Sequence, residues 1–211
     1  MRPLTVAIPK GRVLAQLSPL LERAGVDTAP LFADDRRLIK ETTGGMRFLL
    51  LKPDDVPTYV EFGAADLGVS GRDVLLERRY DLYQPLDLGI GRCRMVVAGL
   101  AGTPTPPVPR VGTKYPRIAT EHFASRGVHA EVVLLQSSVE LAPLVGLCDV
   151  IVDLVETGGT LRDNGLVIIE EICPISSVVI ANRVEFKLRR GEVEPLLAAL
   201  RRAVAATPRG V

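Results

Sequence analysis

The sequence predicts an α/β protein whose sheet is largely parallel and whose 211 residues form two lobes. Short apolar runs alternate with segments that carry apolar residues at helical spacing, which is the pattern of parallel strands connected by helices. A proline-rich stretch, Gly99–Pro109, interrupts this alternation, which then resumes. Because each lobe is too small to be an independent domain, we expect a ligand-binding cleft between the two lobes.

The first half of the chain contains three predicted strands and three predicted helices. The helix Val13–Ala24 has its apolar residues at helical spacing and ends at Gly25. Asp54 and Asp55 open the second helix, which tolerates Pro57 in its first turn. The predicted strands are Leu4–Ile8, Arg47–Leu51 and Leu67–Val69, and the predicted helices are Val13–Ala24, Asp54–Phe62 and Asp73–Arg79.

The second half begins with a strand, Met95–Ala98, and an exposed loop, Gly99–Pro109. This loop either marks a domain boundary or connects two strands within the second lobe. The last helix, Glu192–Ala206, is amphipathic, ends near Pro208 and is expected to fold back onto the first lobe. The expected boundaries are residues 1–92 plus 178–211 for lobe I and residues 93–177 for lobe II. The other predicted strands are Arg110–Gly112, Glu131–Leu135, Val150–Leu154, Leu166–Ile172 and Val178–Ala181, and the other predicted helices are Pro116–Arg126, Val139–Val145 and Thr160–Asn164.

Composition and charge argue against several classes of protein. The formal net charge is +1, which argues against a generic nucleic-acid or membrane binder. No apolar stretch approaches the ~18 residues of a transmembrane helix and no signal peptide is visible, so we expect a cytoplasmic protein. The three cysteines are widely spaced, and neither His122 nor His129 has a partner at metal-ligand spacing. We therefore expect no disulfide framework and no protein-bound metal.

The most informative segment is Val150–Leu161, in which a strongly apolar strand ends in an acid and a loop of small residues follows. The glycines Gly158–Gly159 allow the backbone to approach an anion closely, and successive amides at a helix N-terminus form a concavity for phosphate oxygens. The hydroxyls of Thr157 and Thr160 can donate two more hydrogen bonds. Asp153, at the carboxyl end of the strand, can accept hydrogen bonds from sugar hydroxyls. A plain strand-to-helix turn with a threonine N-cap is the alternative interpretation.

These residues resemble the signature of a known family. From Glu140 to Leu161 the chain is similar to the ATP phosphoribosyltransferases, with Gly146 six positions after Glu140 and with the acid and the loop residues at their expected places. Cys148 stands where the family usually has Ser, Ala or Gly. The resemblance extends over nearly the whole chain. The further blocks that carry it are Ile8–Arg12, Arg36–Ile39, Asp54–Val60, Gly63–Asp73, Leu141–Gly146, Leu161–Leu166 and, without an assigned role, Thr113–Tyr115.

The resemblance implies the two-lobe fold of type II periplasmic binding proteins, with an active-site cleft between the lobes. It also implies that a ring nitrogen of the adenine of ATP attacks the anomeric carbon of phosphoribosyl pyrophosphate and displaces pyrophosphate, which is the first step of histidine biosynthesis. Mg²⁺ accompanies the pyrophosphate in this family. Longer members carry a C-terminal regulatory domain, whereas the short members, which this chain resembles, work with a regulatory subunit related to histidyl-tRNA synthetases. We therefore expect such a partner and a homodimer of the catalytic chain.

The resemblance also assigns roles to individual residues. Arg12 and Arg36 are the expected catalytic residues, because fixed cations stabilise the negative charge that grows on the leaving pyrophosphate. Asp54 and Asp73 are more simply explained as helix caps, and a surface charge is the alternative interpretation of Arg36 and of Glu140. The expected ATP-binding residues are Lys10, Gly11, Arg12, Lys52 and Asp73, and the expected phosphoribosyl pyrophosphate-binding residues are Glu140, Asp153, Thr157, Gly158, Gly159, Thr160 and Leu161.

Three other functions fit part of the sequence. Another phosphoribosyltransferase, of type I, would usually have two adjacent acids before the glycine turn, whereas Asp153 is followed here by Leu154. A non-catalytic solute-binding module would have the same two-lobe fold, but the missing signal peptide and the combination of phosphate loop and arginines weigh against it. A detached LysR-type effector domain is the third alternative, although the sequence has no helix-turn-helix and a net charge near zero.

Overall fold

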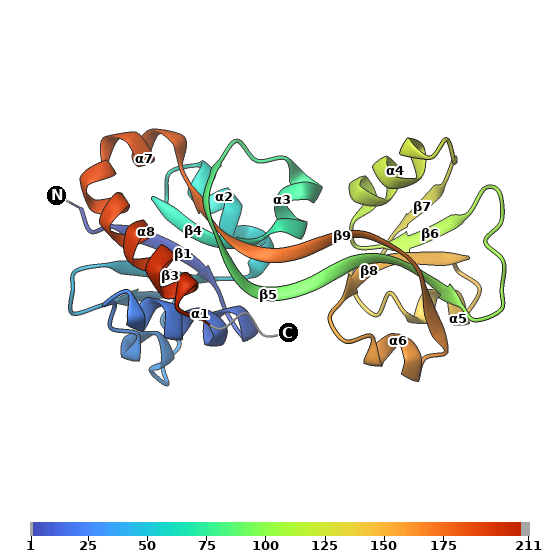
Figure 1. The fold of residues 1–211 in the computed structure, drawn as a ribbon, viewed down its shortest axis with the longest axis horizontal. Coiled ribbons are helices and arrows are strands. Elements are labelled where there is room, and N and C mark those ends of the chain that lie inside the picture. Colours follow the sequence, from blue (N-terminus) through green and yellow to red (C-terminus); the bar gives the residue numbers. More distant parts are fainter. Residues whose placement is uncertain (1, 208–211) are drawn as a thin grey trace. The chain divides into compact units, whose positions relative to one another are not determined.

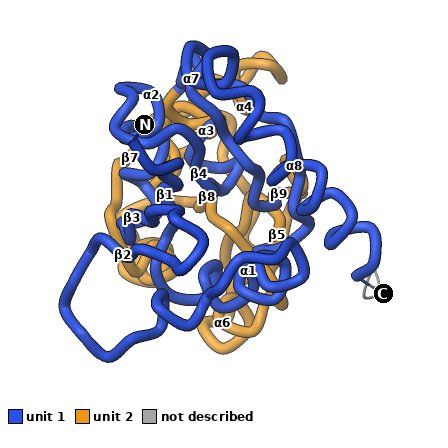
Figure 2. The backbone as a smooth tube through the Cα atoms, turned by 90° about the vertical axis from the view of Figure 1, so that its left-hand side faces the viewer, with its two compact units in different colours: residues 1–75, 79–91, 176–211 blue, residues 76–78, 92–175 orange. Residues whose placement is uncertain are grey.

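The structure is a computed structural model that describes residues 2–207. The chain divides into two compact units (Figure 2). Unit 1 runs from the start of the described chain to Leu75, continues with Arg79–Gly91 and resumes at Ser176, and unit 2 contains Leu76–Arg78 and Arg92–Ile175. The long strands β5 and β9 each belong to both units, so neither unit is a continuous stretch of chain.

In unit 1 the strands follow the order β2-β3-β1-β4-β9. β1 pairs in parallel with β3 and β4, whereas β2 is antiparallel to β3 and β9 is antiparallel to β4. The strands are β1 (Thr5–Pro9), β2 (Ile39–Glu41), β3 (Arg47–Leu51), β4 (Leu67–Gly71) and β9 (Leu166–Ala181). The helices are α1 (Arg12–Arg23), α2 (Val56–Glu61), α3 (Arg72–Arg78), α7 (Arg183–Leu188) and α8 (Arg190–Ala205), with two short 3-10 turns, η1 (Ala29–Phe32) and η2 (Pro53–Asp55).

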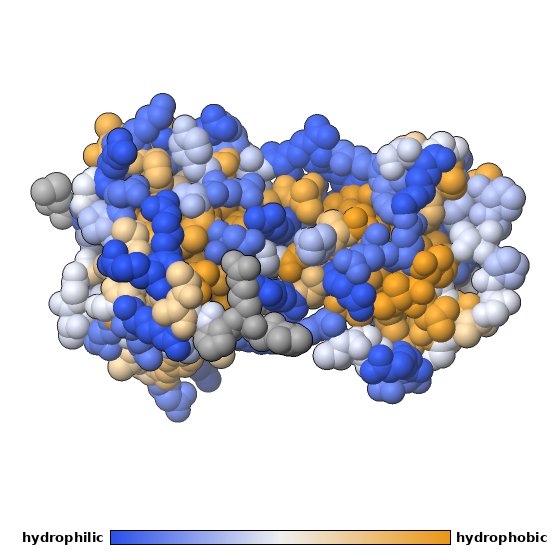
Figure 3. All heavy atoms as spheres, in the orientation of Figure 1, coloured by the Kyte–Doolittle hydropathy of each residue, from blue (hydrophilic) through white to orange (hydrophobic). Residues whose placement is uncertain are grey.

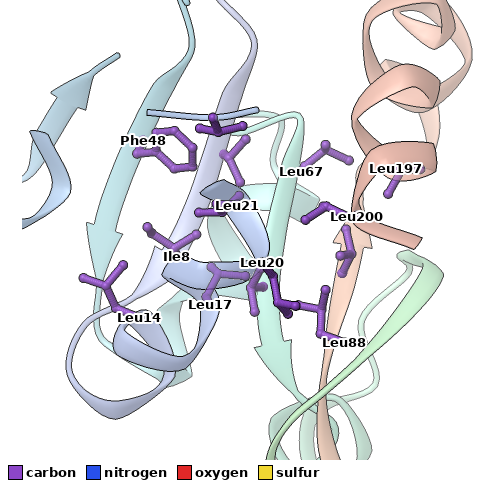
Figure 4. Close-up of a cluster of buried hydrophobic side chains, with 14 of the residues drawn as sticks. Ile8, Leu14, Leu17, Leu20, Leu21, Phe48, Leu67, Leu88, Leu197 and Leu200 are labelled. Carbon is purple, nitrogen blue, oxygen red and sulfur yellow. The ribbon is translucent and has the colours of Figure 1, made fainter. Parts of the chain in front are cut away.

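Helices cover both faces of the unit 1 sheet (Figure 1). Neighbouring residues of a strand point to opposite faces, so Ile8 belongs to the apolar cluster that includes Leu17 of α1 and Leu197 of α8 (Figure 4). Ala7 belongs to the cluster that includes residues of α2. Each of these leucines is almost fully buried, which stabilises the fold by roughly 1.5–3 kcal/mol per side chain. On the α2 side, a Cβ at Gly68 would lie 2.7 Å from the side chain of Val60, so only glycine lets α2 approach the sheet this closely.

In unit 2 the strand order is β9-β5-β8-β6-β7. β6 pairs in parallel with β7 and β8, and β5 is antiparallel to β8. One apolar cluster packs α4 on one face, and a second packs α5 and α6 on the other face. The strands are β5 (Tyr83–Leu100), β6 (Arg110–Thr113), β7 (Glu131–Leu134) and β8 (Val150–Val155), and the helices are α4 (Pro116–Ser125), α5 (Leu141–Leu144) and α6 (Gly159–Asp163).

Most of the predicted strands and helices are present, but the sheet contains more antiparallel pairing than the sequence predicted. β5 begins at Tyr83, well before the predicted start at Met95, and it includes two glycines with positive φ, Gly89 and Gly91. The two predicted strands after Leu166 form a single strand, β9. The elements β2, η1 and α7 were not predicted.

A buried acid connects the first strand of unit 1 with the start of its last helix. Asp66, which is fully buried, accepts hydrogen bonds from Arg2, from the Thr5 amide and from Arg189 at the start of α8. α8 packs on unit 1, as the sequence predicted, and Pro208, near which its end was expected, lies outside the described residues. The predicted loop connects β5 and β6 within unit 2. Between residues 2 and 207 no helix is both long and apolar enough to span a membrane.

Candidate active site

The carboxyl ends of three parallel strands meet at one edge of the unit 1 sheet. β1, β3 and β4 run in the same direction, and the register pairs Pro9 with Leu51. Lys10 follows β1 directly and Lys52 follows β3 directly, and the Lys10 amide donates a hydrogen bond to the Leu51 carbonyl at 3.0 Å. Both lysine side chains are exposed, whereas Asp73, two residues after β4, is half-buried. Because ligands of α/β sheets bind at the carboxyl ends of the strands, this edge is the natural ligand site of unit 1.

A glycine turn connects β1 to α1. Gly11 is the N-cap residue of α1 and has φ 81° and ψ −138°, a backbone conformation that residues with a side chain rarely adopt. No side chain caps this helix, its first turn carries no acidic residue, and Arg12 is its first residue and is exposed. The amides and the positive dipole end of a helix N-terminus favour anions. The turn therefore presents backbone amides and two cations, Lys10 and Arg12, to a phosphate.

Arg36 lies in the segment between η1 and β2, and its side chain is exposed. The carboxylate of the preceding residue, Asp35, accepts hydrogen bonds from Lys40 Nζ at 2.6 Å and from the Arg37 amide at 2.8 Å. These two contacts, that of Lys40 being the larger, lower the pKa of Asp35. Polar contacts, rather than a strand ladder, therefore hold the segment that carries Arg36.

Neither of the two acids expected as helix caps occupies an N-cap position. The N-cap of α2 is Asp55, not Asp54, and the N-cap of α3 is Gly71, not Asp73. Asp73 lies in the first turn of α3, where a carboxylate stabilises the helix dipole. Its carboxylate folds back over Gly71, so that a Cβ added at Gly71 would lie only 2.2 Å from Asp73 Oδ1.

In unit 2, Asp153 lies near the carboxyl end of β8, beside the end of the parallel strand β6. The register pairs Thr113 with Val152, and the buried Thr113 hydroxyl donates a hydrogen bond to the Val152 carbonyl at 2.6 Å. Asp153 is half-buried, and burial raises its pKa to about 6, with a further contribution from the negative charge of Glu140. The Leu154 amide, which donates to Asp153 Oδ1 at 2.8 Å, acts in the opposite direction, as does the charge of Lys114. Glu140 and Lys114 are therefore electrostatic neighbours of Asp153.

The glycine loop after β8 opens helix α6. Gly158 is the N-cap in the left-handed conformation, with φ 75°, so the predicted alternative is wrong about a threonine N-cap, whereas a plain strand-to-helix turn stays the alternative interpretation. The Thr157 hydroxyl accepts a hydrogen bond from the Gly159 amide at 3.4 Å, and the Thr160 side chain is exposed. Arg162 Nη1 donates to the Thr157 carbonyl at 3.1 Å, which holds the loop closed on its own helix.

The remaining phosphoribosyl pyrophosphate-binding residue of the prediction has a different environment. Leu161 is buried and packs with Val155 and Leu166 in the apolar cluster of unit 2. Its side chain anchors α6, and only its backbone can contribute to a ligand site. The predicted site residues thus form two sets. Lys10, Gly11, Arg12, Arg36, Lys52 and Asp73 belong to unit 1, and Glu140, Asp153 and Thr157–Leu161 belong to unit 2.

The sequence did not predict the structural roles of two residues, Glu77 and Lys40. The carboxylate of Glu77 accepts hydrogen bonds from the Arg117 amide at 3.0 Å and the Ile118 amide at 3.1 Å, and so caps α4. Lys40 is buried, although it is flanked by the exposed residue Ile39. Hydropathy would point Ile39 inward and Lys40 outward, so the pattern of β2 gave no signal for the buried lysine.

The histidines and cysteines lie outside both sets of predicted site residues. His122 on α4 contacts Glu170 at 3.2 Å, and burial, followed by the charge of Arg126, lowers its pKa. His129 is exposed. Burial raises the pKa of the Cys148 thiol, as expected for an inert cysteine. In the described part of the chain, no three His, Cys, Asp or Glu side chains are arranged to hold a metal ion.

Known proteins resemble this chain along nearly its full length. The family model described as ATP phosphoribosyltransferase matches residues 52–202. The ATP phosphoribosyltransferase of Sorangium cellulosum is 61% identical over 209 residues, which cover 99% of each chain. A chain of the ATP phosphoribosyl transferase (HisG:HisZ) complex from Thermotoga maritima has a TM-score of 0.85 and 37% identity, and the alignment covers 97% of this chain and all of that one.

A more distant structure confirms the predicted fold class. The periplasmic aliphatic sulphonate binding protein SsuA from Escherichia coli has a TM-score of 0.61 at 14% identity, and the alignment covers 97% of this chain and 73% of that one. This likeness concerns the fold alone, which is the two-lobe fold of type II periplasmic binding proteins. The family model and the identity to the Sorangium protein go further than the fold. The chain belongs to the ATP phosphoribosyltransferase family.

Proposed function

We propose that the chain transfers the phosphoribosyl group of phosphoribosyl pyrophosphate to a ring nitrogen of the adenine of ATP and releases pyrophosphate, as the first step of histidine biosynthesis. The observation that carries this proposal is that Asp153, near the carboxyl end of β8, precedes a glycine loop at the start of α6. The similarity to ATP phosphoribosyltransferases over nearly the whole chain supports the same reaction.

The unit 2 residues suit a ribose that carries a phosphate. The backbone amides that follow Gly158 and the hydroxyls of Thr157 and Thr160 are donors for the oxygens of the sugar phosphate. The carboxylates of Asp153 and Glu140 are acceptors for the ribose hydroxyls. Above pH 6 Asp153 is mostly ionised, which makes it the stronger acceptor.

The unit 1 residues suit the charged groups of ATP and of the leaving pyrophosphate. In our proposal Lys10, Lys52 and the Gly11 turn bind phosphates of ATP. Asp73 is the acidic member of the proposed ATP-binding residues. Arg12 and Arg36 stabilise the charge that moves onto pyrophosphate, because the guanidinium group is a permanent cation that can bind phosphate oxygens in pairs.

The proposed reaction needs positioning and charge stabilisation more than acid–base chemistry. The lone pair of the adenine nitrogen forms the new bond to the anomeric carbon, and the bond from that carbon to pyrophosphate breaks, with its electron pair leaving on the phosphate oxygen. The attacking nitrogen carries no proton, so no general base is required for this step. Fixed cations around the leaving group lower the barrier because they cost no reorganisation in the transition state.

Mg²⁺ enters this proposal as the metal complex of phosphoribosyl pyrophosphate, so it belongs to the substrate. Mg²⁺ usually keeps several water ligands and is held by one or two carboxylates together with substrate phosphates. Asp153 and Glu140 are oxygen donors of this kind, and they are electrostatic neighbours. We also propose that the enzyme works in the cytoplasm.

We further propose that the chain works with a regulatory subunit related to histidyl-tRNA synthetases and that it forms a homodimer. The similar Thermotoga maritima chain comes from a HisG:HisZ complex, which supports a hetero-oligomer. Val167, Ile168 and Ile169 at the start of β9 are exposed, and apolar atoms gather over this part of unit 2 (Figure 3). Exposed apolar patches of this kind mark protein interaction sites.

A spectrophotometric assay tests the proposed reaction. The purified chain is mixed with ATP, phosphoribosyl pyrophosphate, Mg²⁺ and a pyrophosphatase, with and without a purified regulatory subunit. We expect phosphoribosyl-ATP to form, and omission of either substrate serves as the control. If no product forms under either condition, the transferase proposal is wrong, and titration calorimetry with small metabolites then tests the alternative of a solute-binding module.

A further inference from the structure

A buried lysine lies on the short edge strand of unit 1. The side chain of Lys40 in β2 is only 5% exposed, while its neighbours Ile39 and Glu41 are exposed. The β2–β3 register places Lys40 opposite Phe48, which is fully buried. An ammonium group in such surroundings is costly unless it is paired and hydrogen-bonded, so the partners of Lys40 indicate what the residue does.

The partners of Lys40 all lie in the segment that carries Arg36. Lys40 Nζ donates to Asp35 Oδ1 at 2.6 Å and to the Ala33 carbonyl at 3.4 Å. The same Asp35 oxygen accepts a hydrogen bond from the Arg37 amide at 2.8 Å, and the Asp35 amide donates to the Ala33 carbonyl at 2.8 Å. The ammonium group thus binds two residues that precede Arg36, and the Asp35 carboxylate connects it to the amide of the residue that follows Arg36.

Little else in the surroundings of Arg36 fixes its backbone. The segment has no helix or strand between η1 and β2, and its residues from Ala33 to Ile39 are exposed. It is tied at its start by the Ala33 amide, which donates to the Pro30 carbonyl at 3.4 Å, and at its end by Leu38, whose carbonyl accepts from the Leu50 amide at 2.8 Å. Ordering an exposed segment costs conformational entropy, and the Lys40 contacts are what offsets that cost here.

We propose that Lys40 is a positioning residue for phosphoribosyl transfer, which holds Arg36 in place through Asp35 and the Ala33 carbonyl without touching a substrate. This inference rests on the proposed function, which makes Arg36 a catalytic residue. The arrangement has a physical reason. A cation that stabilises transition-state charge must be pre-organised, and a misplacement of about 1 Å can cost roughly 100-fold in rate.

The test is a double-mutant cycle of Lys40→Met with Arg36→Ala in the full-length chain, assayed with the regulatory subunit present throughout. Methionine keeps the length and removes the charge. We expect Lys40→Met to lower kcat by roughly 10- to 100-fold with a change in KM of less than about threefold. In the Arg36→Ala background the same substitution should change kcat by less than about twofold, because it acts only through Arg36.

Two further variants keep the test decisive. Asp35→Asn removes the partner rather than the buried lysine, and should reproduce the kcat loss if Lys40→Met does not fold. Glu41→Gln is the matched control, since Glu41 lies on the same strand and forms an exposed ion pair with Arg47 of β3 at 2.9 Å. Its kcat should stay within about twofold of the wild-type value.

The outcomes separate this inference from the proposed function. Equal losses from Lys40→Met in both backgrounds, or no loss in either, overturn the positioning role and leave the transferase reaction standing. Normal kcat in Arg36→Ala also overturns the role, because there would be no catalytic group to position. A wild-type chain that forms no phosphoribosyl-ATP is the separate failure of the proposed function itself, and the inference falls with it.

Discussion

The two sets of candidate site residues are held in place by different physical means. In unit 2, Asp153 lies on β8, between the antiparallel strand β5 and the parallel strand β6, and the end of β6 is tied to β8 by the buried hydroxyl of Thr113. In unit 1, Arg36 lies on an exposed segment at the sheet edge, tied by the ion pair of Lys40 and Asp35. Asp153 is therefore positioned by the core of unit 2, whereas Arg36 is positioned by a local polar contact.

This difference suits the two tasks. A group that recognises a sugar must be fixed before the ligand arrives, and a ladder of backbone hydrogen bonds provides that rigidity. In the proposed reaction a cation that stabilises the leaving group must also be pre-organised, and in unit 1 the contacts of Lys40 with Asp35 and with the Ala33 carbonyl provide that order on an exposed segment. We therefore expect substitutions in unit 1 to affect turnover and substitutions in unit 2 to affect substrate affinity and stability.

The largest effect is expected for Arg12→Ala. Arg12 is the first residue of α1 and exposed, so its loss should leave the core intact while it removes a cation from the leaving group. We expect kcat to fall roughly 100- to 1,000-fold, as for the loss of one transition-state donor. Steady-state kinetics with both substrates is the measurement. Arg23→Ala, at the other end of the same helix, is the control, and near-normal turnover in Arg12→Ala would show that Arg12 is not a catalytic cation.

The next effect is expected for Asp153→Asn. The amide keeps the size of the carboxylate but loses its charge, and hydrogen bonds to charged groups contribute about 1.5–3 kcal/mol. We therefore expect KM for phosphoribosyl pyrophosphate to rise on the order of 10- to 100-fold, while KM for ATP changes little. Asp163→Asn, on the exposed side of α6, is the control. A rise that is equal for both substrates would contradict a ribose-specific role.

The same substitution should change how stability depends on pH. In the folded chain the pKa of Asp153 is about 6, above its ordinary value of 3.8, so the folded state binds more protons than the unfolded state between these two values. The free energy of unfolding therefore falls as pH rises through this window, by at most roughly 3 kcal/mol. Urea unfolding at about pH 4 and about pH 7.5 should show that Asp153→Asn lacks this component. We expect the affinity for phosphoribosyl pyrophosphate to change in the opposite direction and to rise with pH, because the ionised carboxylate of Asp153 is the form proposed to bind the ribose.

The sequence predicted the acid and the loop of unit 2 because their physical cause is local. A strongly apolar strand that ends in an acid, followed by small residues, fixes where the chain must turn, and the structure has Asp153 and the glycine turn at these positions. The resemblance to the family added the cations of unit 1. The side chain of Leu161 belongs to the core, so its predicted role in ligand binding stays a prediction for its backbone alone.

The sequence could not predict the features that depend on tertiary contacts. The burial of Lys40 runs against the hydropathy of β2, and it depends on Asp35, which is only five positions away but outside any regular pattern. The capping of α4 by Glu77 joins residues 40 positions apart. The antiparallel pairing of β5 with β8 and of β9 with β4 was missed because strand direction follows from chain topology rather than from local periodicity.

A smaller effect is expected for Thr113→Val, which tests how the core holds the unit 2 set. Valine matches the shape of threonine but leaves the Val152 carbonyl and the Tyr115 amide without their hydroxyl partner, which lies 2.6 and 2.8 Å away. Leaving buried polar groups unsatisfied costs about 1–3 kcal/mol, which urea unfolding measures. Thr120→Val is the control, since that exposed hydroxyl bonds only to its own helix, and it should cost less than about 0.5 kcal/mol.

The smallest effect is expected for Gly158→Ala, which separates backbone strain from site chemistry. Gly158 has φ 75°, and a Cβ there would lie 3.3 Å from Arg162 Nη1, at the flexible end of a side chain that can move aside. The cost in unfolding free energy should therefore be the left-handed strain alone, about 1 kcal/mol. Gly191→Ala in α8 should have the opposite sign, because Gly191 has open space around it and helical alanine is better than glycine by roughly 0.5–1 kcal/mol. If Gly158→Ala were as stabilising as Gly191→Ala, the loop after β8 would not need its glycine for the turn, and close approach of a phosphate would be the remaining reason for it.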